Sequence, residues 1–216
     1  MASQFPQARF TAGELSVALV VVSIVAVLAL VGSEALLKLN RPLHSTASRI
    51  LAMSAAIEAY KADNGVYPQG PVTNALDPSS MAPAIYDPAN YKASSVFLWQ
   101  QLSGHLKDIN PTLPPTGTNY AGKIFDDSLL EGTMTGSRVT AVVFIKDPFG
   151  KSFGYGTAGL AARQVNSAAA AKNPDAALRL AGYNPTFDLW STSGKTRQTG
   201  VAGAANDVKN FWVKNW

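Results

Sequence analysis

Proteins commonly use histidine, cysteine or clustered acidic side chains to catalyse a reaction or bind a transition metal. This chain has no cysteine, which excludes disulfides, thiol catalysis and cysteine-ligated zinc. Its two histidines, His44 and His105, lie far apart, and neither stands in a catalytic motif. The densest acid cluster, Asp126, Asp127 and Glu131, has no partner pattern, and we expect it in a solvated loop. We therefore expect no enzymatic activity.

One carboxylate, Glu14, stands directly before an uncharged apolar run. As a helix, this run, Leu15–Ser33, would rise about 29 Å, which is close to the hydrocarbon thickness of a bilayer. The run therefore predicts a transmembrane helix. A carboxylate at the edge of hydrocarbon is costly unless it is paired. Glu14 thus either pairs with a positive group or is solvated at the helix N-terminus, where the helix dipole favours it.

Three other interpretations of the apolar run stay open. A buried core helix is one, although this run has no polar face to meet water. A secretory signal peptide is the second, because small residues at 31–33 would allow a cut before Glu34. A plain single-pass anchor is the third. Its orientation is undecided, since Arg9 lies before the run and Lys38 and Arg41 lie after it.

The residues before the apolar run, Arg9-Phe10-Thr11-Ala12-Gly13-Glu14-Leu15, resemble the class III signal of type IV prepilins and type II secretion pseudopilins. The resemblance implies that a prepilin peptidase cuts between Arg9 and Phe10 and methylates the new Phe10 amine. The family usually has glycine where this chain has Arg9. The resemblance also implies that Glu14 acts in assembly, where it pairs with the Phe10 amine of a neighbouring subunit. A slip in register would then leave a buried charge unpaired.

The helical pattern continues beyond the apolar run as far as Asp63. Pro42 should kink the helix, and Asn64-Gly65 should end it. The residues Tyr60, Gly65, Tyr67 and Pro68 are similar to the helix end of pseudopilins. Apolar residues recur on one helical face, which we expect to pack on a globular domain. This predicted inner face comprises Ala47, Ile50, Leu51, Ser54, Ile57 and Tyr60.

Beyond Pro68 the sequence predicts a small domain of helices and strands. Ser95–Leu106 has helical spacing, and the Ala-rich stretch Ala158–Leu180 is also predicted to be helical, with a break near Asn173-Pro174. The predicted strands are Val139–Lys146, its returning partner Lys151–Gly156, and a last strand within Tyr183–Gly194.

Two segments of this domain resemble the major pseudopilin of type II secretion. They are the turn Asp147-Pro148-Phe149-Gly150 and the closing segment at 206–212. In many relatives the loop before the closing segment binds calcium, which takes six to eight oxygen ligands. Here the loop 191–206 holds no acid, so the ligands would be Ser191 and Asp207. Calcium is the one cofactor that the resemblance implies, and closure of the loop by hydrogen bonds is the alternative.

Charge is sparse and scattered along the chain. Charged residues make up 15% of it, and the net charge is +4. Low charge suits a protein that packs against copies of itself. The basic residues form no run with interleaved aromatic residues, so we expect no binding to nucleic acid.

Together these features predict an α+β, pilin-like fold. A long N-terminal helix, transmembrane in its first half, would pack on a small antiparallel β-sheet domain. The predicted parts are a prepilin leader over 1–9, the transmembrane and assembly helix over 10–64, and a periplasmic globular domain over 65–216.

The predicted function is a structural subunit of a type II secretion pseudopilus or a type IV pilus-like filament, used for protein export. Its predicted location is the bacterial inner membrane, as a single-pass protein, and then a filament in the periplasm or at the cell surface. The implied partners are other pilins or pseudopilins, the prepilin peptidase, an inner-membrane assembly platform and, before assembly, membrane lipid. The alternatives are a major pilin for adhesion, motility or DNA uptake, and a membrane-anchored periplasmic binding domain that never polymerises.

Overall fold

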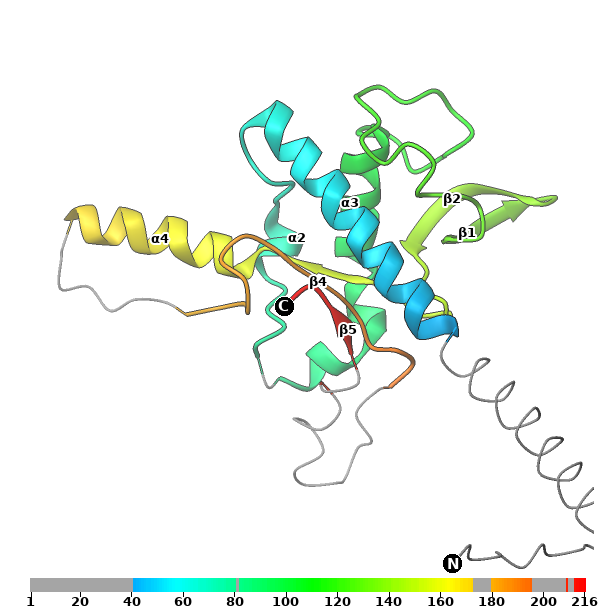
Figure 1. Ribbon diagram of the computed structural model, residues 1–216. Coiled ribbons are helices and arrows are strands. Elements are labelled where there is room, and N and C mark those ends of the chain that lie inside the picture. Colours follow the sequence, from blue (N-terminus) through cyan, green and yellow to red (C-terminus); the bar gives the residue numbers. More distant parts are fainter. Residues whose placement is uncertain (1–40, 81, 173–179, 196–208, 210–211) are drawn as a thin grey trace, which may run out of the picture. The chain divides into compact units, whose positions relative to one another are not determined.

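The computed structural model describes residues 41–80, 82–172, 180–195, 209 and 212–216. In this part of the chain a helix over 41–64 comes first, and short helices then precede and interrupt the strands (Figure 1). The later elements, in order, are α2 (Pro71–Asn74), the 3-10 turns η1 (Pro83–Tyr86) and η2 (Pro88–Tyr91), α3 (Lys92–Ser103), β1 (Leu130–Thr135), β2 (Arg138–Ile145), β3 (Gly154–Gly156), α4 (Ala158–Lys172), β4 (Asp188–Ser191) and β5 (Val213–Lys214).

The strands form two small antiparallel sheets. β1 and β2 make a hairpin in which Leu130 pairs with Ile145 and Thr135 with Arg138. The second sheet has the order β3-β4-β5. The C-terminal strand β5 therefore pairs with β4 and forms one edge of the second sheet.

The predicted transmembrane fold and membrane location need correction. Among the described residues the helices are short or carry charged side chains, and none is both long and apolar enough to cross a membrane. The described residues form an α+β domain with small antiparallel sheets, and no membrane-spanning helix is found among them. The single-pass inner-membrane location, and the transmembrane, periplasmic pilin and secretion assignments that depended on it, therefore lose their support. The run Leu15–Ser33, on which they rested, lies outside the described residues.

The helix over 41–64 ends where the sequence predicts. Gly65 takes the left-handed conformation, with φ +74°, and its N–H donates to the Lys61 carbonyl at 2.8 Å. A left-handed residue of this kind commonly ends a helix, and glycine adopts it without strain. The predicted kink at Leu37–Arg41 falls almost wholly on residues outside the described part.

The predicted inner face of this helix is only half right. Ile50 and Ile57 are buried and Tyr60 is half-buried, but Ala47 and Leu51 are exposed. Thr46 and Met53 are buried in their place. The buried positions follow i, i+4, i+7 and i+11 spacing with Ala56 beside them, so the packed face is turned around the helix relative to the predicted face.

The predicted hairpin of Val139–Lys146 with Lys151–Gly156 is wrong in its pairing. β2 pairs with β1, which the sequence did not predict, and Glu131 lies on that strand and not in a loop. The returning segment makes an isolated bridge, Ser152 with Lys146 just after β2, and the Phe153 N–H donates to the Ile145 carbonyl at 3.0 Å. It then joins β4 as β3. The turn links the two sheets because Asp147 holds it closed, as described below.

The main hydrophobic core lies where the helix over 41–64, α3 and the sheets meet. Its largest fully buried side chains include Met53, Trp99 and Tyr155. A second, aromatic cluster lies around β4 and the C-terminal segment and comprises Ile85, Tyr86, Tyr91, Trp190 and Trp212. The second cluster places Trp190 of β4 against side chains from far along the chain.

Candidate assembly surface

Most of the predicted site residues lie outside the described part of the chain. These are the processing residues Arg9 and Phe10, the assembly residue Glu14 and the predicted calcium ligand Asp207. Ser191 is the one that the structure places. The roles of Arg9, Phe10 and Glu14 therefore stay predictions.

An apolar ridge runs along the outside of the helix over 41–64. It consists of every fourth residue from 43 to 59, and all of them are exposed. We call this set the outer ridge: Leu43, Ala47, Leu51, Ala55 and Ala59. Leu51 is the most prominent, with 73% of its surface exposed, and Leu43 is 38% exposed. Rows of every fourth residue are the ridges that pack into grooves when helices meet other elements.

The outer ridge has the character of a packing surface more than of a solvated face. Its small alanines let another backbone approach closely, and Leu51 stands between Ala47 and Ala55 as a single large knob. Glu58 is exposed and lies beside the outer ridge, three residues after Ala55. The Glu58 carboxylate accepts a hydrogen bond from the Tyr67 hydroxyl at 3.2 Å, which fixes its position. The ridge thus combines an apolar row with one acid at its side.

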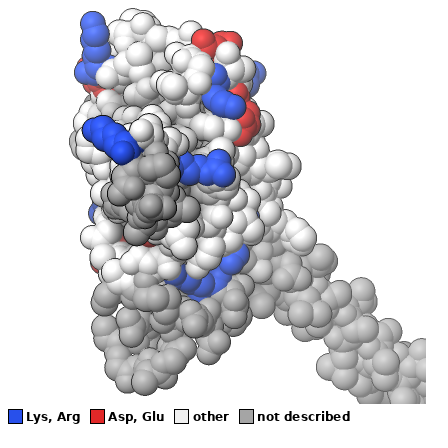
Figure 2. Space-filling model, turned by 90° about the vertical axis from the view of Figure 1, so that its left-hand side faces the viewer, with Lys and Arg blue, Asp and Glu red and all other residues white. Residues whose placement is uncertain are grey.

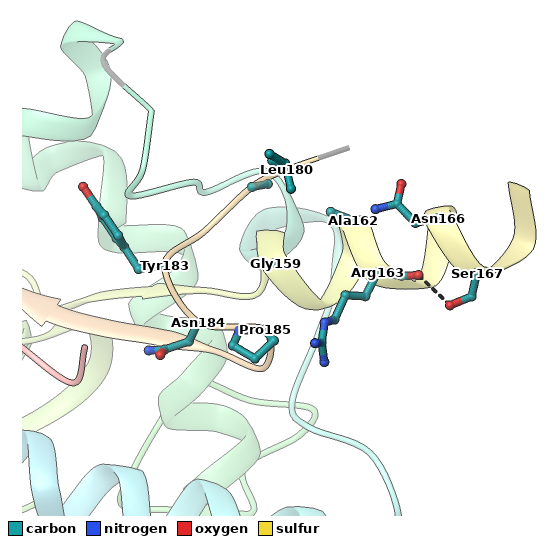
Figure 3. A pocket seen from close by; sticks show the side chains of 10 residues that line it. Gly159, Ala162, Arg163, Asn166, Ser167, Leu180, Tyr183, Asn184 and Pro185 are labelled. Carbon is teal, nitrogen blue, oxygen red and sulfur yellow. Dashed lines mark hydrogen bonds between the residues drawn. The ribbon is translucent and has the colours of Figure 1, made fainter. Parts of the chain in front are cut away.

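A hollow of about 720 Å³ lies elsewhere, between α4 and the segment 180–185 (Figure 3). Figure 3 shows Arg163 and Asn166 leaving α4 in different directions. The Ser167 hydroxyl donates to the Arg163 carbonyl at 2.9 Å, so it is used within the helix. Because these polar groups do not converge on one point, the hollow presents no catalytic arrangement.

On the face that Figure 2 shows, Lys and Arg form separate small groups among uncharged residues. Most of that face is uncharged, as the charged fraction of 15% implies. Such a surface offers no single charged tract to attract a highly charged ligand.

Ser191, one of the two predicted calcium ligands, closes the C-terminal part by hydrogen bonds. Its hydroxyl donates to Asp147 Oδ2 at 2.5 Å and accepts from the Ser193 N–H at 3.0 Å. The other Asp147 oxygen accepts from the N–H groups of Phe149 and Lys151 at 2.9 and 2.7 Å. Burial raises the pKa of Asp147, although the bonds from Ser191 and Lys151 oppose this shift. Asp147 therefore ties the turn after β2 to β4.

Among the described residues no three His, Asp or Glu side chains cluster at metal-binding range. Calcium binding by Ser191 with Asp207 stays a prediction, because Asp207 lies outside those residues. The Ser191 oxygen already serves as both donor and acceptor within the protein. That arrangement favours closure by hydrogen bonds, the alternative that the sequence left open.

Replacing Ser191 with alanine separates these two roles. Loss of a buried hydrogen bond to a carboxylate should lower the free energy of unfolding by about 2 kcal/mol. If Ser191 acts through Asp147 alone, urea unfolding should give the same loss in calcium and in a chelator. A loss that appears only in calcium would assign Ser191 to a metal site.

Lys209 makes a second closure of the C-terminal segment. Its side chain is only 5% exposed, and its ammonium donates to the carbonyls of Pro78 and Ser80 at 2.6 and 2.9 Å. The Tyr86 ring centroid lies 5.3 Å from the ammonium, and the Trp212 centroid 5.8 Å from it. Burial lowers the pKa of Lys209, and the nearby Asp77 carboxylate opposes that shift.

Asp188, at the start of β4, is a third buried charge in this region. Its two oxygens accept from the N–H groups of Tyr183 and Asn184 at 3.0 and 2.9 Å. Burial raises the pKa of Asp188 to about 6, although these two bonds oppose the shift. The nearby Asp77 carboxylate contributes to this rise and lies beside the same segment, because it accepts from the Gly182 N–H at 2.9 Å. These acids and Lys209 hold the C-terminal half together.

The chain matches no protein-family model, no curated protein and no solved structure. Its resemblance to pilins and pseudopilins therefore rests on the motifs of the sequence alone.

The sequence pattern missed the outer ridge because Ala47 and Leu51 were assigned to the packed face. It missed the role of Asp147 because that residue looked like an ordinary turn former. Two sequence features could have indicated the role of Asp147. It stands directly before Pro148, and its hydrogen-bond partner Ser191 lies in a later strand.

Proposed function

We propose that this chain is a structural subunit that assembles with further copies into a filament, as its resemblance to pilins and pseudopilins implies. Assembly uses packing of apolar surface and no catalysis. The outer ridge of the helix over 41–64 lies buried between subunits, with Leu51 at its centre. As the resemblance implies, Glu14 sets the register between subunits.

The observation that carries this proposal is the exposure of Leu51 on a row of small apolar residues. Single exposed leucines are common on protein surfaces and need no explanation. A row of five uncharged, apolar residues at four-residue spacing on a surface helix is different, because such a row forms a continuous ridge for packing. The low charge of the chain supports the same conclusion, since little repulsion opposes the approach of copies.

Sedimentation of the full chain with the variant Leu51→Glu tests this proposal. We expect the wild type to pellet as filaments that are visible by electron microscopy. A charge buried at the centre of an apolar contact costs well over 1.4 kcal/mol, so the variant should pellet at least about ten-fold less. Circular dichroism should show an unchanged fold, because Leu51 is exposed within the subunit.

The matched control is Leu180→Glu, at a leucine that is 92% exposed and far from the ridge in sequence. It should pellet like the wild type. Equal pelleting of Leu51→Glu and wild type would remove the ridge from assembly. A wild type that stays monomeric at every concentration, also with its cognate machinery, would favour the non-polymerising binding domain instead.

A further inference from the structure

An apolar groove of about 460 Å³ lies between α2, α3 and β2, away from the outer ridge. It is lined by aliphatic and aromatic side chains, with Lys92 and Gln100 as its polar members. Three of the lining side chains are well exposed, namely Val72 at 43%, Ile109 at 41% and Val143 at 41%. No part of the described chain fills this groove.

The groove uses the opposite side of α3 from the core. The core takes Leu98, Trp99 and Leu102 of this helix. The groove takes positions 93, 96, 97 and 100, which follow helical spacing on the other face. α3 is therefore apolar on both sides, and a helix of that kind is normally covered on both.

We propose that this groove receives the outer ridge of a second copy of the chain, with Leu51 inserted among Val96, Phe97 and Val143. This inference rests on the proposed function and names the partner surface of the same assembly contact. The ridge presents one large side chain between alanines, and the groove has a volume of about 460 Å³. One chain therefore carries both the apolar outer ridge and the apolar groove.

The two surfaces also carry one pair of opposite charges, and Lys61 lies beside the acid, with its ammonium 5.0 Å from the Tyr67 ring centroid. Lys92 lines the groove, and its ammonium lies over the Phe144 ring, 5.4 Å from the centroid. No acid is among the residues that line the groove. Glu58 stands beside the ridge, exposed and fixed by Tyr67. With the ridge in the groove, Glu58 of one copy and Lys92 of the next can pair at the rim.

A contact of this kind would also allow an open-ended assembly. A contact between two different surfaces of one chain is heterologous, so each copy keeps a free ridge at one end and a free groove at the other. Such contacts extend into a ring or a helical filament. A contact of ridge with ridge would instead close as a dimer and stop.

Cysteine cross-linking tests the contact directly, because the natural chain has no cysteine. The full chain with Leu51→Cys and Val143→Cys is oxidised under assembly conditions and separated on a non-reducing gel. We expect a ladder of dimers, trimers and larger products. A mixture of the two single variants should stop at dimers. Both positions are exposed within the subunit, so the changes should leave the fold intact.

The matched control pairs Leu51→Cys with Leu180→Cys, which keeps the ridge cysteine and moves the second one to another exposed leucine. It should give at least about ten-fold less ladder, since a disulfide needs Cβ atoms about 4 Å apart. An equal ladder, or strong dimers from Leu51→Cys alone, would overturn the proposal. If the wild type forms filaments and the designed pair gives no ladder, the groove is wrong and the proposed function stands. If no filament forms, the proposed function fails first.

Discussion

Replacing Lys209 with alanine should unfold the C-terminal closure and cost about 3 kcal/mol of the free energy of unfolding. The variant loses the packing of a long buried side chain against Tyr86 and Trp212. It also leaves the carbonyls of Pro78 and Ser80 without the ammonium that donates to both. Differential scanning calorimetry should show a melting temperature about 9 °C below that of the wild type.

Two variants show which part of Lys209 matters. Lys209→Met keeps the apolar stem and removes the charge, so it should recover roughly half of the loss. Lys214→Ala removes a half-buried lysine that lies over the Trp216 ring, and it should change stability by less than about 1 kcal/mol. For a protein of this size, a loss of 1 kcal/mol lowers the melting temperature by about 3 °C. A melting temperature of Lys209→Ala within about 2 °C of the wild type would therefore show that Lys209 does not stabilise the C-terminal segment.

Replacing Gly154 with alanine should be as damaging, for a steric reason. A Cβ at position 154 would lie 2.2 Å from an atom of the Trp190 ring on the neighbouring strand. The ring has little room to move, because Trp190 is fully buried and packs against Tyr91 and Trp212 at centroid distances of 5.2 and 6.2 Å. Overpacking of this kind costs up to about 3 kcal/mol, which urea unfolding measures.

A double variant tests the steric cause. In Gly154→Ala with Trp190→Leu, the added methyl group no longer meets a ring, so the two losses should fall short of additive by more than about 1 kcal/mol. Gly70→Ala is the control glycine, since its Cβ would meet only the half-buried Phe97 ring at 3.2 Å. Additive losses in the double variant would show that Trp190 is not the obstacle.

The sequence predicted those helices and strands whose apolar spacing or terminating residues lie within the element itself. Asn64-Gly65 ended the first helix because a left-handed glycine is a local feature. The apolar run of β2 and the helical spacing of α3 were also found, within a few residues of their observed bounds. β1 was missed because Glu131, Gly132 and Thr133 interrupt any apolar alternation. Its strand exists through pairing with β2.

The candidate site was less predictable, because it depends on what each side chain meets in three dimensions. The sequence does not distinguish an apolar helix residue that faces the core, such as Ile50, from one that faces solvent, such as Leu51. Lys209 looked like an ordinary charged residue of a tail. Its burial follows from the carbonyls of Pro78 and Ser80, which lie far away in sequence.

A helical reconstruction of the assembled full chain, by electron cryo-microscopy, tests subunit packing most directly. We expect Leu51 and Ala55 of every copy to lie against apolar side chains of another copy. Filaments in which these residues face solvent would contradict this expectation, and so would a chain that remains single under every condition of assembly.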